Sequence, residues 1–347
     1  MKFGLFDHID RSDDRPLSQQ FDERIEFVKA ADEAGFYCLH VAEHHSSPLN
    51  MCPAPSIYLS MVAQATQHIH MGPLVYLLTL YTPLRLAEEI CMLDHISKGR
   101  LEVGVGRGVS PFELNFHRVD HDDSRNIFFD AYACLNEALS NDVFSYEGKY
   151  FSYDNVPMPL RPYQDPLPYW YASSNTVGAE WAGEQGMHFT SNGPIPQAKE
   201  NIDAYVAALK KRGGPAQPKK EFPGGAAIGQ LRHIFVADTD EEARKIAKPA
   251  LEHHIGNLNW LRMRHGDTEF TKRLNVHRGA SYESWEEMDM VIAGSPETVI
   301  AEITRQTEIL GINYLLAYLF FGSMTLEQAM RSFTLFRDEV MPKLADL

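Results

Sequence analysis

The feature that most constrains the fold of this 347-residue chain is a repeated alternation of short strand-like apolar runs and amphipathic helical segments. No linker-like break in composition divides the alternation. The pattern therefore predicts an α/β fold, a single (β/α)8 TIM barrel domain over residues 1–347, in preference to two doubly wound domains. The predicted strands are 2–6, 38–42, 70–78, 101–105, 169–172, 189–191, 231–236 and 314–317.

Two segments interrupt the alternation. Residues 144–151 alternate in polarity and turn at Glu147-Gly148, which predicts an inserted hairpin. Periodicity weakens over residues 262–290, before the last helix-strand unit. We expect a long mobile loop there that closes over the site, because long irregular segments in compact domains are usually functional or disordered.

The composition of the chain limits the classes of partner that it can bind. Asp and Glu outnumber Lys and Arg by 47 to 32, and the net charge of -15 opposes nonspecific attraction to nucleic acid or to anionic membranes. The four cysteines form no C-x-x-C pair, and neither a signal peptide nor a long apolar span is evident. These observations favour a reduced, cytoplasmic protein without nucleic-acid or membrane partners.

A glycine-rich stretch follows the fourth predicted strand. Arg107 stands among Gly104, Gly106 and Gly108, at the strand end where α/β barrels place their ligand sites. Because glycine has no side chain, a ligand can approach the backbone closely here, and the cation of Arg107 beside this backbone suggests that the ligand carries a phosphate. Taken alone, the stretch is also compatible with glycines that only permit tight packing and an arginine that pairs with a surface carboxylate.

Residues 173–176 (SSNT) follow the fifth predicted strand and cap the next helix. A helix N-terminus can receive an anion through backbone amides and hydroxyl groups, although capping alone also explains the pattern. Because this turn and Arg107 follow consecutive barrel strands, we expect both to face one phosphate.

The most reactive group in the sequence is Glu43-His44-His45, at the end of the second predicted strand. Adjacent residues on an extended chain point in opposite directions, so the two histidines are poorly placed to share a metal ion, and we predict no metal site. Structural histidines remain an alternative. We favour acid/base chemistry or cofactor contact, with His44 and His45 as the candidates and Asp7, His8 or Glu43 as groups that orient His44.

Beyond these patterns, the chain resembles the bacterial luciferase-like flavin monooxygenases over nearly its whole length. The resemblance is carried by AEHH at 42–45, TPLRLAEE at 82–89, DHISKGR at 94–100, GRG at 106–108, EWA at 180–182 and GSPE at 294–297. It implies a (β/α)8 barrel that uses reduced FMN from a separate flavin reductase and O2, through a flavin C4a-hydroperoxide. It also implies a homodimer.

The resemblance assigns roles to individual residues. It implies His44 as the catalytic acid/base and Arg107 as a phosphate ligand. It places Ser174, Asn175 and Gly178, beside Ser173, around the FMN phosphate, and a non-prolyl cis peptide at Leu74-Val75 under the flavin ring. Three positions depart from the luciferase alpha chain: Ser174 replaces a glutamate, Gly178 a hydroxyl residue and Gly106 a cysteine.

These observations lead to an FMN-dependent monooxygenase acting on a small organic substrate that the sequence does not identify. An oxidoreductase that uses the deazaflavin F420, and a flavin-binding protein without turnover, are the alternatives.

Overall fold

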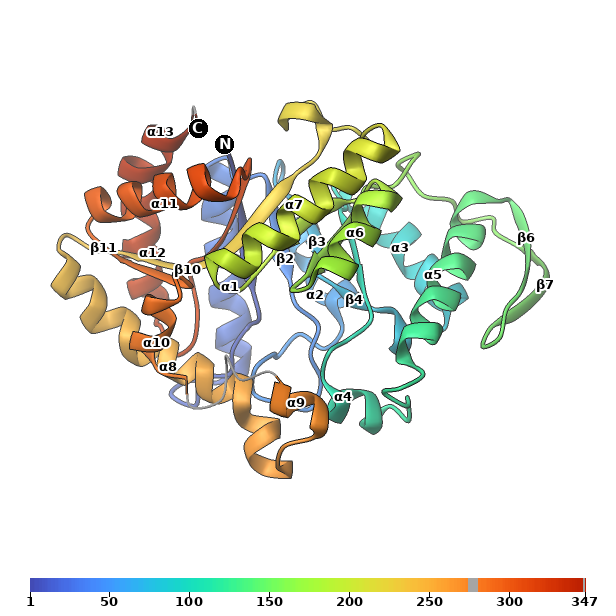
Figure 1. Cartoon of the computed structure of the whole chain (residues 1–347), viewed down its shortest axis with the longest axis horizontal. Helices are drawn as coiled ribbons and strands as arrows, with labels where there is room; N and C mark the ends of the chain where they lie inside the picture. The colour runs from blue at the N-terminus through green and yellow to red at the C-terminus, as the bar shows by residue number, and fades with distance from the viewer. Residues whose placement is uncertain (274–279, 346) are drawn as a thin grey trace.

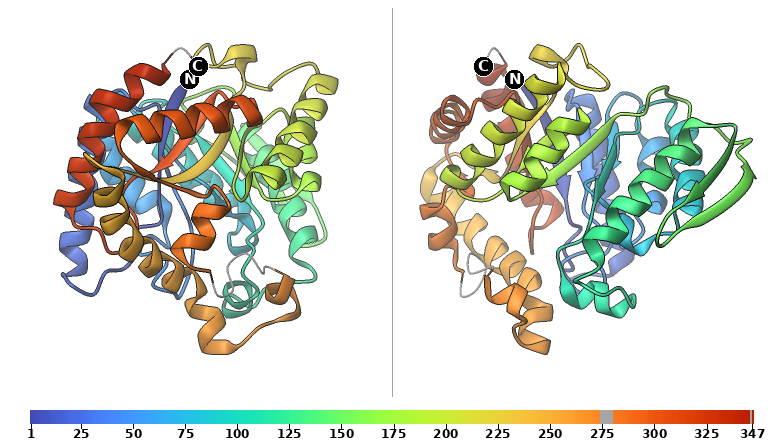
Figure 2. Two further views of the ribbon diagram at one scale, coloured as in Figure 1. Left: turned by 60° about the vertical axis from the view of Figure 1, so that its left-hand side comes forward. Right: turned by 45° about the vertical axis from the view of Figure 1, so that its right-hand side comes forward.

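A barrel of parallel strands forms the centre of the protein, and helices cover its outside (Figures 1 and 2). The computed structural model describes residues 1–273, 280–345 and 347. Within this part of the chain, nine strands follow one another in the order β3-β2-β1-β12-β10-β9-β8-β5-β4. Their bounds are β1 (Lys2–Asp7), β2 (Cys38–Val41), β3 (His70–Pro73), β4 (Tyr76–Leu77), β5 (Val103–Gly106), β8 (Tyr169–Ser173), β9 (His188–Ser191), β10 (Ile228–Val236) and β12 (Tyr314–Tyr318).

A short bridge nearly closes the barrel between β3 and the residues that precede β5. Met71 pairs in parallel with Leu101, its N–H donates to Arg100 O at 2.9 Å, and Glu102 N–H donates back to Met71 O at 2.9 Å. The predicted α/β barrel is therefore present.

Most of the longer helices connect successive strands and bury one apolar face against the sheet. Ser295 caps α11 by accepting from Thr298 N–H, and Gly311 ends that helix at φ +69°. The helices are α1 (Leu17–Glu33), α2 (Pro55–Ala65), α3 (Pro83–Ser97), α4 (Pro111–Phe116), α5 (Ser124–Ser140), α6 (Thr176–Gln185), α7 (Ile195–Arg212), α8 (Asp240–His265), α9 (Glu269–Arg273), α10 (Tyr282–Glu287), α11 (Pro296–Leu310), α12 (Leu326–Leu335) and α13 (Met341–Leu344).

The two ends of the barrel differ. The chain termini meet at one end, where the Met1 amino group donates to Ala345 O at 2.8 Å. Helices α4 and α9 lie at the opposite end, where the carboxyl ends of the strands open (Figure 1). The end of α8 reaches α4 there, with the rings of Phe112 and His265 5.6 Å apart. Among the described residues, no helix is long and apolar enough to cross a membrane.

The structure corrects two expectations. The predicted third strand, 70–78, is divided into β3 and β4 at Leu74 and Val75. The prediction of an irregular loop at 262–290 is wrong for much of this segment, because α8 continues to His265 and α9 and α10 follow. Residues 274–279 of that loop lie outside the described part, and its mobility stays a prediction.

Two elements lie beside the main barrel path. Strand β11 (Val291–Gly294), which the periodicity did not indicate, pairs in parallel with the second half of β10. Strands β6 (Val143–Glu147) and β7 (Ser152–Pro157) pair antiparallel as a separate two-stranded sheet that projects from the barrel (Figure 1).

Candidate functional site

A cavity of about 230 Å³ lies at the carboxyl ends of β2, β4, β5 and β8. It gathers seven of the predicted site residues, although they are spread over more than 130 positions of the chain. The members of that set that line it are His44, Leu74, Val75, Arg107, Ser173, Ser174 and Asn175. His45 and Gly178 are not among the lining residues.

One end of this cavity is cationic. Arg107 follows β5 and donates from Nη1 to Ser124 Oγ at 3.0 Å. Burial lowers the pKa of Arg107, and the nearby charge of Arg125 lowers it further, whereas Tyr171 opposes the shift. Within the described residues, no carboxylate forms an ion pair with either arginine. Arg107 therefore presents a partly buried guanidinium without an acidic partner, which favours binding of an anion, whereas Arg125 is exposed and is not among the residues that line the cavity.

The N-terminus of α6 borders the same end. Asn175 is its N-cap and accepts from Gly178 N–H at 2.9 Å. Ser173 Oγ accepts from Asn175 N–H at 3.2 Å, which fixes the turn. A Cβ at Gly178 would lie 2.5 Å from Ser173 Oγ, so glycine is needed there for space. The predicted cofactor role of Gly178 stays a prediction, and its amide already serves the cap.

The wall between the two ends is apolar. The peptide bond between Leu74 and Val75 is cis, as the resemblance predicts. A Cβ at Gly106 would lie 2.3 Å from Val75 Cγ2, and one at Gly104 would lie 2.1 Å from Pro73 O. These two glycines therefore make room for the segment between β3 and β4. The interpretation that these glycines clear space for a ligand is wrong for Gly104, which does not line the cavity; Gly106 does line it, and its role toward a ligand stays a prediction.

His44 marks the other end of the cavity and is held by Glu113. Its Nδ1 lies 3.1 Å from Glu113 Oε1, and Glu113 Oε2 accepts from His45 N–H at 2.9 Å. Burial opposes charge on His44, but the negative charge and hydrogen bond of Glu113, with a smaller effect of Glu43, raise its pKa. Burial would raise the pKa of Glu113, but the contact with His44 and the hydrogen bond from the His45 amide lower it.

His45 points away from the cavity. Its Nε2 lies 2.9 Å from Glu43 Oε1, and Glu43 is only 2% exposed. The other oxygen of Glu43 accepts from Leu77 N–H at 3.2 Å and from Tyr81 Oη at 2.9 Å. The histidines point in opposite directions, as the extended chain predicts. His45 is tied to the wall of the barrel, whereas His44 faces the cavity.

The sequence interpretation missed Glu113 and Arg125. The sequence does carry a signal that Glu113 lies in the first turn of a helix. Ser110 and Pro111 begin this short helix, and Ser110 Oγ accepts from Glu113 N–H at 3.4 Å. No local signal selects Glu113 as the partner of His44. Asp7, one of the groups expected to orient His44, instead pairs with Arg24 at 3.2 Å.

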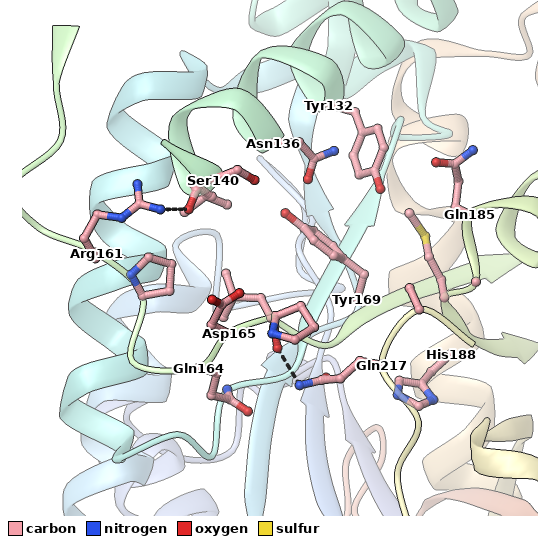
Figure 3. Close-up of a pocket in the computed structure, with 17 residues that line it drawn as sticks. Tyr132, Asn136, Ser140, Arg161, Gln164, Asp165, Tyr169, Gln185, His188 and Gln217 are labelled. Atoms are coloured by element: carbon pink, nitrogen blue, oxygen red, sulfur yellow. Dashed lines mark hydrogen bonds between the residues drawn. The ribbon is translucent and has the colours of Figure 1, made fainter. Parts of the chain in front are cut away.

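A larger cavity, of about 390 Å³, lies at the amino ends of β8 and β9, away from these residues (Figure 3). Tyr169 and His188 line it, together with Arg161 and Gln217. The Arg161 guanidinium already donates to Ala138 O and Leu139 O at the end of α5, and Gln217 donates to Pro166 O. None of the predicted site residues lines this cavity, so the smaller cavity is the candidate site.

Comparison with known proteins identifies the family. The model of the family described as luciferase-like monooxygenase matches residues 1–313. The uncharacterized protein y4wF of Sinorhizobium fredii is 35% identical over 345 residues, which cover 99% of this chain and 97% of that protein. The oxygenase component of the flavin-dependent trigonelline monooxygenase of Acinetobacter baylyi is 27% identical over 251 residues, 71% of this chain and 68% of that protein.

A solved structure shares the fold. The oxygenating constituent of 3,6-diketocamphane monooxygenase from Pseudomonas putida, a type II Baeyer-Villiger monooxygenase in complex with FMN, superposes with a TM-score of 0.80. The match covers 99% of this chain and 98% of that chain at 22% identity.

Proposed function

Because the chain belongs to the luciferase-like monooxygenase family, we propose that it is a flavin-dependent monooxygenase that uses reduced FMN and O2 to oxygenate a small organic substrate. The observation that carries this proposal is the division of one cavity into a cationic end at Arg107 and a proton-donating end at His44, with an apolar wall between them.

The described residues fit FMN. Arg107 and Arg125, with the N-terminus of α6, would hold its phosphate, since guanidinium groups and helix-terminal amides both bind phosphate oxygens. Leu74 and Val75 would contact the flavin ring. Reduced flavin supplies the electrons that activate O2, and the protein supplies binding, orientation and exclusion of water.

His44 would donate a proton at the other end of the cavity. Its Nδ1 is engaged by Glu113, so Nε2 is the ring nitrogen left for exchange with a substrate. The raised pKa keeps the ring protonated nearer neutral pH, where a general acid is most effective. We assign His45 a supporting role, because Glu43 holds its Nε2.

We further propose a separate flavin reductase as the source of reduced FMN, and a homodimer. The name of the Acinetobacter relative, an oxygenase component, supports the first. Exposed apolar side chains on the neighbouring helices α2 and α3 support the second: Ile57 is 71%, Met61 46% and Met92 54% exposed. Sedimentation tests the homodimer.

The test of the activity couples the protein to an NADH:FMN reductase under labelled O2. A panel of aldehydes, ketones, sulfonates and terpenes is supplied, and the products are examined for the label. We expect labelled product only with a substrate, the protein and reduced FMN together. Binding of reduced F420 with no affinity for FMN would refute the proposal, as would FMN binding without labelled product from any compound.

A further inference from the structure

His8, at the carboxyl end of β1, lies against His44 and takes no part in the chemistry assigned above. The two imidazole rings are stacked, with centroids 5.6 Å apart and planes 26° apart. Phe6, His254 and Tyr318 surround the rest of the His8 ring, with centroids 4.8, 5.3 and 5.6 Å away. The residue is partly exposed and is not itself among the residues that line the cavity, but packing fixes its ring beside His44, which does line it.

A buried carboxylate holds the neighbours of His8 in place. Asp10 is 1% exposed and lies 2.9 Å from His254 Nδ1. It also accepts from Tyr318 Oη at 2.7 Å, from Gly322 N–H at 3.1 Å and from Asn257 Nδ2 at 3.2 Å. These contacts orient two of the rings around His8. The wall is therefore rigid before any ligand arrives.

The His8 ring itself is not engaged by hydrogen bonds within the described part of the chain. Its Nδ1 is buried without a hydrogen-bond partner. The hydrogen bond that the residue forms comes from its backbone, where His8 N–H donates to Tyr318 Oη at 3.3 Å. Burial, with the charges of His254 and His44, holds the pKa of His8 well below its usual value, although Asp10 opposes this. The ring is neutral and has one N–H to donate.

The charges around His8 select the kind of group that can meet it. Each carboxylate nearby already has a basic partner: Asp7 has Arg24, Asp10 has His254, and Glu113 has His44. A carboxylate ligand would thus find no unpaired cation here among the described residues, and burying it beside a neutral imidazole would be unfavourable. An uncharged oxygen incurs no such penalty and satisfies the imidazole N–H.

We propose that His8 is a substrate-binding residue that donates a hydrogen bond to an uncharged oxygen, a carbonyl or a hydroxyl, of the organic substrate beside His44. This inference rests on the proposed function, since it places the substrate at the His44 end of the cavity. It specifies what that function leaves open, namely that the substrate carries a neutral oxygen near the reacting atom.

The experiment uses the FMN-loaded protein and three probes that share one ring: cyclohexanone, cyclohexanol and cyclohexanecarboxylate. Binding is followed through the ring-nitrogen NMR signals of ¹⁵N-labelled histidine. We compare the wild type with His8→Phe, which keeps an aromatic ring, and His8→Gln, which keeps a donor. His68→Phe, at an exposed histidine just before the amino end of β3, is the matched control.

We expect the two neutral probes to shift the His8 signals and to bind about threefold to tenfold more weakly to His8→Phe, the share of one neutral hydrogen bond. His8→Gln should restore part of this affinity, and His68→Phe should change nothing. FMN affinity should be the same in all four proteins. If His8→Phe fails to fold, the wild-type signals and His8→Gln still decide the question.

Equal binding of the neutral probes by the wild type and His8→Phe would overturn the assignment, as would no shift of the His8 signals with either neutral probe. Tighter binding of cyclohexanecarboxylate than of cyclohexanone would overturn the preference for an uncharged oxygen. FMN binding by the wild type is measured in a separate titration. Absence of binding there would count against the proposed function itself.

Discussion

Replacement of Glu113 by Gln tests the acid/base assignment most directly. Glu113 is 4% exposed, and its carboxylate both contacts His44 Nδ1 at 3.1 Å and accepts from His45 N–H at 2.9 Å. The amide keeps the size of the side chain, but its single oxygen can accept from His44 Nδ1 or from His45 N–H and not from both. With that oxygen toward His44, the substitution replaces a charged acceptor by a neutral one and leaves the His45 amide without this acceptor.

The magnitude follows from the change in hydrogen-bond type. A hydrogen bond to a charged group contributes about 1.5–3 kcal/mol, and a neutral one about 0.5–1.5 kcal/mol, a difference of about 1–1.5 kcal/mol. At about 1.4 kcal/mol per factor of ten, protonated His44 becomes about fivefold to twelvefold rarer at alkaline pH. Turnover on the alkaline side should fall by about the same factor.

The assay is the pH dependence of kcat with a substrate found in the labelled-oxygen experiment. In the wild type, activity is lost as the pH rises through the raised pKa of His44. In Glu113→Gln this alkaline limb should move to lower pH. Glu43→Gln is the control, because Glu43 contacts His45 and affects His44 less.

Stability should show the same coupling. The His44 contribution is complete below its ordinary pKa of 6.5 and is lost as the pH rises through the raised value. The Glu113 contribution is present above its ordinary pKa of 4.5 and is lost as the pH falls through the lowered value. The difference in Tm between wild type and variant should thus be largest between about pH 4.5 and 6.5. An unmoved alkaline limb in Glu113→Gln would refute the role assigned to this pair.

Further predictions concern the cavity and the packing around it. Arg107→Ala should weaken FMN binding by about 1.5–3 kcal/mol, measured by fluorescence titration, and an unchanged affinity would remove Arg107 from the phosphate site. His44→Ala should leave folding and FMN binding nearly intact while single-turnover product formation falls about 100- to 10,000-fold. His45→Ala should cost less turnover but lower the Tm, because Glu43 loses a partner; a fully active, destabilised His44→Ala protein would reverse these roles. Gly106→Ala should lower both Tm and FMN affinity, because the added methyl group would displace Val75. Gly256→Ala should raise the free energy of unfolding by about 0.5–1 kcal/mol, because a Cβ at this position of α8 meets open space. Equal effects of the two substitutions would contradict the packing argument.

The sequence by itself determined the features that depend on neighbours along the chain. Periods of two and of 3.6 residues are set by local backbone geometry, so the alternation predicts the barrel, and its strand ends predict where ligands bind. The same reasoning predicts that His44 and His45 point in opposite directions. The segment at 262–290 failed this reasoning, because short helices such as α9 and α10 carry too few turns to show a period.

Only the tertiary structure decided which groups meet at the carboxyl end of the barrel. Glu113 is 69 residues from His44, and Asp10 is 244 residues from His254. Such pairs form because barrel closure brings loops from distant strands to one rim, and no local pattern records which side chains then face each other. The same holds for Gly106, where a side chain would collide with Val75 of the neighbouring segment. Sequence therefore locates the rim, and the curvature of the closed sheet selects the pairs of residues that act there.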